Sequence, residues 1–167
     1  MIKIIGTKGN IKDVDIFLKQ IQNFAKKISV VVQVFDADVI YGKNHLVSAV
    51  QHAVRAFDRK TNTTNSLDKE ILLYASGERQ LKLAIPKTGV KKGKADIAFI
   101  FIGEKIVDKL INELLQKLLL KRDDKILEGD INTLKKFGLT ESEIKTVSKD
   151  KYGDLILEKI ALVDIIK

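Results

Sequence analysis

Residues 43–80 read KNHLVSAVQHAVRAFDRKTNTTNSLDKEILLYASGERQ, a stretch that holds both histidines and three of the four arginines of the chain. After Asn44, apolar residues recur at helical spacing, which predicts an amphipathic helix that Asn44 caps. The opposite, polar face of this helix spans an arc of roughly 80° at about 100° per residue. Its members are His45, Ser48, His52, Arg55 and Arg59.

This polar stripe has three interpretations. It is the solvated outer face of a surface helix, as amphipathic helices commonly show. Alternatively it binds an anion, because the planar guanidinium of arginine matches phosphate and histidine can stack or donate. A metal site is the third and weakest option, since His45 and His52 are two helical turns apart and the chain has no cysteine.

A helical corner follows the stripe. The sequence predicts a second helix over Leu67–Ala75, a stop at Ser76-Gly77, and a short third helix over Glu78–Ile85 that Pro86 ends. The Ser76-Gly77 junction would leave backbone N–H groups free at a helix start, where an anion can be held. An ordinary helix–turn–helix corner explains these residues equally well.

Composition indicates one domain, residues 1–167, without disulfides or a thiol nucleophile. The net charge of +8 lies entirely in a basic half, residues 1–105, whereas residues 106–167 carry twelve basic and twelve acidic side chains. A basic half favours a polyanionic partner such as nucleic acid. The first six residues resemble a strand rather than a signal peptide, and no apolar run is long enough to span a bilayer, so we expect a cytoplasmic protein without membrane contact.

Three strands alternate with helices, which predicts an α/β fold: a β-sheet of at least three strands surrounded by helices, with a helical C-terminal part. The expected strands are Lys3–Ile5, Ile28–Phe35 and Ala95–Ile102, and Gly6–Gly9 is expected to be a turn. The expected helices outside the central stretch are Asn10–Lys27, Glu104–Arg122, Asp124–Phe137 and Leu155–Lys167, the last after a turn at Tyr152–Asp154. Thr140 and Glu143 form a capping box. Asp36 and Asp38 end a strand, where turn or cap roles are commoner than a metal site.

Motifs for catalysis are absent from the sequence. It contains no Gly-x-Ser-x-Gly, no phosphate-binding loop, no His-Glu-x-x-His and no dinucleotide fingerprint. These absences favour a binding module over an enzyme, and we expect no cofactor, no metal and no small-molecule substrate.

The runs Ala53–Phe57 and Glu70–Gln80, with Ala84-Ile85 and Gly89-Val90 after them, resemble the PRPK-binding protein family. That family is the small accessory subunit of the KEOPS complex, which makes threonylcarbamoyladenosine in tRNA. The resemblance implies a mixed α/β sheet and a non-catalytic protein that binds a small atypical kinase/ATPase subunit. It also implies that archaeal members grip the single-stranded CCA 3′ end of tRNA.

Carried onto this chain, the resemblance gives a set of expected site residues. Unstacked bases are held on aromatic or guanidinium planes with backbone charge beside them. The expected tRNA-binding residues are Lys43, His45, His52, Arg55, Arg59, Tyr74, Ser76, Gly77, Glu78, Arg79 and Gln80. The apolar C-terminal helix is buried either in its own fold or in a partner, and Ile156, Ile160 and Val163 are the expected kinase interface. The alternative function is a protein–protein adaptor of the kinase without an RNA-binding role.

Overall fold

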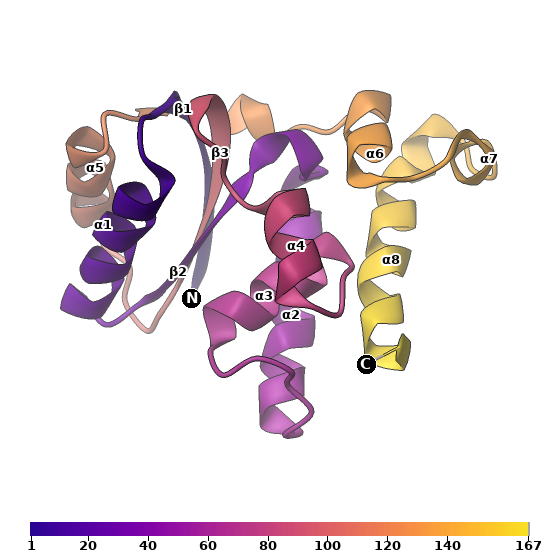
Figure 1. Ribbon diagram of the computed structural model, residues 1–167, viewed down its shortest axis with the longest axis horizontal. Helices are drawn as coiled ribbons and strands as arrows, with labels where there is room; N and C mark the ends of the chain where they lie inside the picture. Colours follow the sequence, from indigo (N-terminus) through magenta and orange to yellow (C-terminus); the bar gives the residue numbers. More distant parts are fainter. Residues whose placement is uncertain (167) are drawn as a thin grey trace.

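Four strands form a single sheet in the computed structural model, which describes residues 1–166 (Figure 1). They are β1 (Ile2–Ile11), β2 (Val31–Asp36), β3 (Gly93–Ile102) and β4 (Lys121–Arg122), in the order β2-β3-β1-β4. Every pair of neighbours is antiparallel. Since β3 lies between β1 and β2, those two run parallel to each other, and β1–α1–β2 is a βαβ unit split by an antiparallel strand. The α/β class is confirmed, with an antiparallel sheet in place of the mixed one.

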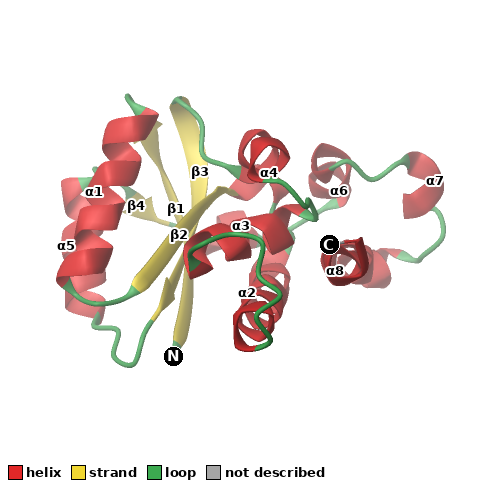
Figure 2. Cartoon of the chain, turned by 60° about the horizontal axis from the view of Figure 1, so that its bottom comes forward, coloured by secondary structure: helices red, strands yellow, loops and turns green. Residues whose placement is uncertain are grey.

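Helices cover both faces of this sheet (Figure 2). The α-helices are α1 (Val14–Lys27), α2 (Gly42–Asp58), α3 (Leu67–Ser76), α4 (Leu81–Thr88), α5 (Asp108–Lys117), α6 (Ile131–Phe137), α7 (Glu141–Ile144) and α8 (Tyr152–Ile166). Short 3-10 helices occupy Ala37–Val39 (η1), Asp124–Leu127 (η2) and Lys149–Lys151 (η3). Helices α1 and α5 lie on one face, and α2, α3 and α8 lie on the other (Figure 1).

Side chains that alternate along the strands contribute to two hydrophobic cores, one on each face of the sheet. In β3, Phe99 and Phe101 face the core under α1 and α5, whereas Ala98 and Ile100 face the core under α2 and α3. Successive strand residues point to opposite faces, so a strand covered on both sides must be apolar throughout. This explains the unbroken apolar run that made β3 predictable.

The first strand is longer than predicted. Gly6–Gly9 is not a turn but the middle of β1, and α1 begins after an Asp13 cap rather than after Asn10. Both glycines permit close packing: a Cβ on Gly6 would lie 2.6 Å from the backbone oxygen of Asp123, and one on Gly9 2.3 Å from Leu120. Because both positions lack a Cβ, the segment around β4 can pack closely against β1.

Pro86 lies inside α4 and does not end it, contrary to the prediction. Proline removes one backbone donor, which leaves only the carbonyl of the exposed Lys82 without its helical bond. The helix continues because Thr88 donates its hydroxyl to Ala84 and Gly89 donates its N–H to Ile85.

The C-terminal half departs most from the predicted boundaries. Helix α5 stops at Lys117, Leu119 adopts a left-handed backbone with φ 57°, and the next residues become β4. The predicted helix over 124–137 divides into η2 and α6. The Thr140 capping box is confirmed in α7. Helix α8 starts at Tyr152, where a turn was expected, and the expected final residue, Lys167, lies outside the described residues.

Two further boundaries move by a few residues. β2 begins at Val31 instead of Ile28, because Ser29 takes a positive φ of 55° and separates it from α1. Helix α2 begins at Gly42, so Asn44 is inside the first turn and is not its cap.

Candidate functional site

The side chain of His45 points into the protein, not onto the solvated face as predicted. It is 1% exposed, its Nδ1 accepts from the backbone N–H of Tyr41 at 3.0 Å, and its Nε2 donates to the carbonyl of Ala75 at 2.7 Å. These partners require the neutral ring with the proton on Nε2. Burial lowers the pKa of His45 to about 4. His45 therefore ties the start of α2 to the end of α3 and cannot touch a ligand directly.

An open cavity of about 410 Å³ lies beside this helix start. No side chain caps α2, and Lys43 and Asn44 are exposed at its rim. The far wall contains Gly129, Asp150, Gly153, Asp154 and Leu157. Uncapped N–H groups and a lysine favour an anion here, whereas the two aspartates oppose one, so the cavity is of mixed charge. Sequence reasoning missed this wall because its residues are about a hundred positions from Lys43.

His52 belongs to a second cluster, which joins three helices. Its ring stacks on Tyr74 of α3, with centroids 5.4 Å apart. Its Nδ1 lies 2.7 Å from Oδ2 of Asp164 in α8 and 3.1 Å from Nη2 of Arg55. Tyr74 donates its hydroxyl to the other oxygen of Asp164, and burial together with this carboxylate raises the pKa of Tyr74. The acid that pairs with His52 was missed because it is 112 residues away along the chain.

Arg55 and Arg59 are the members of the predicted stripe that remain outside. Arg55 is exposed in the last turn of α2, and Arg59 is exposed at the residue that follows the helix. Twelve residues separate Lys43 from Arg55, which corresponds to about 18 Å along a helix at 1.5 Å per residue. Helix α2 therefore has the exposed Lys43 near its start, the buried His45 in its first turn, and the exposed Arg55 and Arg59 at its end.

The Ser76-Gly77 junction has its own backbone groups satisfied. Ser76 is buried, donates to the carbonyl of Leu73 at 2.8 Å and accepts from the N–H of Glu78 at 3.1 Å. Gly77 adopts φ 69°, and its N–H bonds to α3 carbonyls. This left-handed ending satisfies the last turn of a helix. The expectation of free N–H groups for an anion is therefore wrong at this junction.

The residues after the junction face outward in part. Arg79 and Gln80 are exposed before α4. Glu78 is 3.4 Å from Lys87, whose ammonium lies 4.0 Å over the ring of Phe137. Burial lowers the pKa of Lys87. Glu78 is therefore part of a half-buried ion pair, and the exposed cation of this corner is Arg79.

The predicted kinase-interface residues are buried in the core of the chain itself. Ile156, Ile160 and Val163 are each 0% exposed and pack with residues of α2, α3 and α6. On the outer side of α8, Leu162 is 37% and Ile165 77% exposed. The three residues therefore pack inside the fold, contrary to their expected place at a kinase interface. The apolar surface of α8 that a partner could reach is at its C-terminal end.

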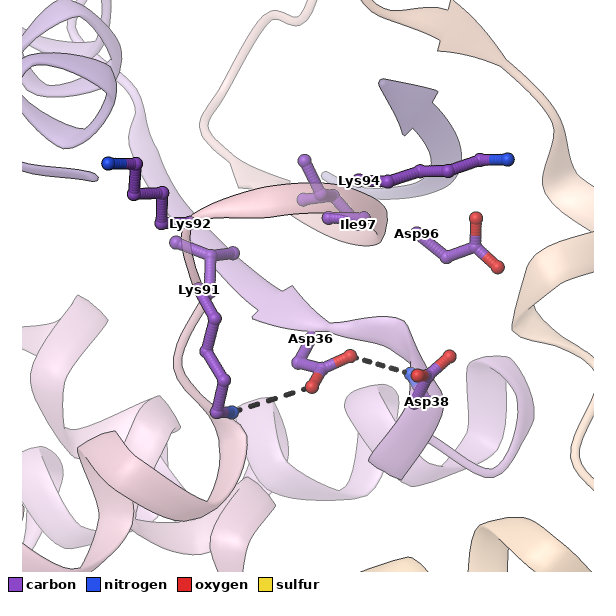
Figure 3. Close-up of a pocket in the computed structure, with 9 residues that line it drawn as sticks. Asp36, Asp38, Lys91, Lys92, Lys94, Asp96 and Ile97 are labelled. Atoms are coloured by element: carbon purple, nitrogen blue, oxygen red, sulfur yellow. Dashed lines mark hydrogen bonds and ion pairs between the residues drawn. The ribbon is translucent and has the colours of Figure 1, made fainter. Parts of the chain in front are cut away.

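A hollow of about 450 Å³ lies at the end of β2 and the start of β3 (Figure 3). Asp36 accepts from the N–H of Asp38 at 3.0 Å and lies 3.5 Å from Lys91. It thus has the predicted cap role. Across residues 1–166, no three His, Asp or Glu side chains gather in a way that could hold a metal ion. Lys92 and Lys94 extend from the rim, so the hollow is a solvated, mixed-charge surface.

Comparison with known proteins gives two matches. The family model described as kinase binding protein CGI-121 matches residues 9–164. The regulatory protein Cgi121 of Methanocaldococcus jannaschii is 32% identical over 152 residues, covering 89% of this chain and 93% of that protein. Both descriptions are of binding and regulation, in agreement with the expectation of a non-enzymatic protein. Within residues 1–166, no helix has the length and apolar character needed to cross a membrane.

Proposed function

Because the chain belongs to the CGI-121 family of kinase-binding proteins, we propose that it is the small, non-catalytic subunit of a KEOPS complex in the cytoplasm. In this role it binds and activates the atypical kinase/ATPase subunit and recruits tRNA by the single-stranded CCA 3′ end. The family match supports the kinase partner, and the charge of the chain supports the RNA.

The observation that carries the RNA-binding role is the exposed cations of α2. Lys43 at its start and Arg55 and Arg59 at its end are all exposed, and they belong to the half of the chain that carries the entire net charge of +8. Arginine can pair with phosphate in a bidentate manner and can stack on an unpaired base. Tyr74 and His52 support this surface from beneath, and Arg79 adds a cation from the adjacent corner.

A charge-reversal experiment tests this surface. The double variant Arg55→Glu, Arg59→Glu is compared with Lys145→Glu, Lys149→Glu, which changes charge equally on exposed residues of the neutral half. Binding of tRNA is measured by fluorescence anisotropy at several salt concentrations. We expect the α2 variant to weaken binding and to lower the salt slope by about 1.4, since each single-strand phosphate contact contributes about 0.7. Equal effects of the two variants would remove α2 from the site.

For the kinase we propose the C-terminal end of α8. Leu162 and Ile165 are large, apolar and exposed, and a partner that covered them would gain about 25 cal/mol per Å² of buried apolar surface. The test is Ile165→Asp, with Ile16→Asp as the control, because Ile16 is 59% exposed on α1 in the opposite layer. Calorimetric titration with the kinase should show at least a tenfold loss for Ile165→Asp alone. Loss with both variants, or with neither, argues against this surface.

The second candidate function is a kinase adaptor that does not bind RNA. The exposed apolar end of α8 supports the kinase contact without any need for RNA. The charge-reversal experiment separates the two, because an adaptor shows no tRNA binding for the α2 variant to weaken.

A further inference from the structure

A single carboxylate holds the end of α8 to both helices beneath it. Asp164 uses Oδ2 for His52 of α2, at 2.7 Å from Nδ1, and Oδ1 for the hydroxyl of Tyr74 of α3. Leu162 and Ile165, which are close to it in the sequence and lie on the outer side of α8, are exposed. The same turn of α8 thus presents the proposed kinase contact to solvent and joins α8 to α2 through Asp164.

His52 cannot satisfy both of its partners through one nitrogen. To donate to Asp164, Nδ1 must carry a proton, whereas to accept from Arg55 at 3.1 Å it must present a lone pair. Two arrangements follow. In one, His52 donates to Asp164 and Arg55 is released; in the other, Arg55 donates to His52 and the carboxylate loses its imidazole donor.

Asp164 is therefore placed to connect two surfaces. We propose that Asp164 couples RNA binding on α2 to kinase binding on α8, so that each partner raises the affinity of the other; this inference rests on the proposed function. A phosphate that draws Arg55 away leaves Nδ1 to donate to Asp164, which fixes the last turn of α8. A kinase that covers Leu162 and Ile165 removes water from around Asp164 and strengthens the same bond.

The coupling must be reciprocal, since binding free energies obey linkage. The affinity of the kinase for the protein should therefore rise with saturating tRNA by roughly fivefold or more, the lower range of typical couplings. The physical element with two states is the Nδ1 hydrogen bond, and each ligand biases it from a different side.

The test measures kinase affinity with and without saturating tRNA for the full chain and for Asp164→Asn. Asparagine keeps an oxygen for the hydroxyl of Tyr74, but its amide nitrogen replaces the oxygen that accepts from Nδ1 of His52. We expect the ratio of the two affinities to fall from about five or more toward one. Glu158→Gln, at an exposed acidic residue in the middle of α8, is the matched control and should keep the ratio of the unaltered chain.

Replacement of the histidine gives an independent check. His52→Gln removes the nitrogen that changes partners, so it should also abolish the ratio, whatever its effect on either affinity alone. If tRNA and kinase both bind the unaltered chain with a ratio of one, the coupling is overturned and the proposed function stands. If Asp164→Asn keeps the full ratio, Asp164 is only a structural contact. Absence of tRNA binding would overturn the proposed function and the coupling together.

Discussion

His45 donates its Nε2 proton to the carbonyl of Ala75 at 2.7 Å, joining the first turn of α2 to the last turn of α3. The ring also packs edge-on against Phe137 at 5.6 Å. A histidine in this position is a structural hydrogen-bonding group, and its burial has a consequence for stability.

The buried His45 should make stability fall in mild acid. Its pKa is about 4 in the folded protein against 6.5 for an unperturbed histidine, so between these values the unfolded chain binds the additional proton. Stability contributed by the neutral ring is present above pH 6.5 and is lost as pH falls toward 4. The loss in the free energy of unfolding amounts to about 3 kcal/mol, because a shift of one pKa unit corresponds to about 1.4 kcal/mol.

Urea unfolding at pH 5 to 7 measures this dependence. His45→Gln should unfold more easily at pH 7 but with a much flatter dependence on pH over that range. A pH dependence equal to that of the unaltered chain would show that another group is responsible.

Two glycines that face the ring of Tyr41 should respond in opposite ways to alanine. A Cβ at Gly129 would lie 2.3 Å from Cδ2 of Tyr41, whereas one at Gly153 would lie 3.6 Å from the ring. Gly129→Ala should therefore destabilise by about 1 to 3 kcal/mol through overpacking. Gly153→Ala, inside α8, should stabilise by about 0.5 to 1 kcal/mol. Thermal unfolding reads both, and a similar change in the two variants would contradict the packing described for Tyr41.

Helix α8 offers a matched pair of isoleucines for testing its burial. Ile160→Ala should cost about 2 to 5 kcal/mol because it leaves a cavity in the core. Ile165→Ala should change stability by less than about 0.5 kcal/mol, since Ile165 is exposed. Denaturant midpoints with unchanged slopes would report these differences. Comparable losses would mean that Ile165 also packs inside.

The elements that sequence predicted well are those specified by local chemistry. Helix α3 ends where predicted because Gly77 takes the left-handed conformation that glycine favours. The capping box of Thr140 involves only four consecutive residues. Residues 97–102 of β3 are all apolar because both faces of the strand are covered there. For these elements, the sequence pattern that predicts the structure lies within the same few consecutive residues that form it.

The features that sequence missed depend on distant partners. Gly6 and Gly9 look like turn residues until the segment at Leu120–Asp123 packs beside them. His45 turns inward because Ala75 and Phe137 surround it, and Asp164 reaches His52 from the other end of the chain. No periodicity within α2 could reveal these contacts, since each requires the complete fold.

We propose that this kinase-binding protein also holds the single-stranded end of tRNA, and one titration can decide this. The protein bound to its kinase is titrated with intact tRNA and with the same tRNA lacking the CCA end. We expect removal of the CCA end to weaken binding at least tenfold at physiological salt. Equal affinity for the two RNAs, or no binding of either, would contradict it and favour the adaptor.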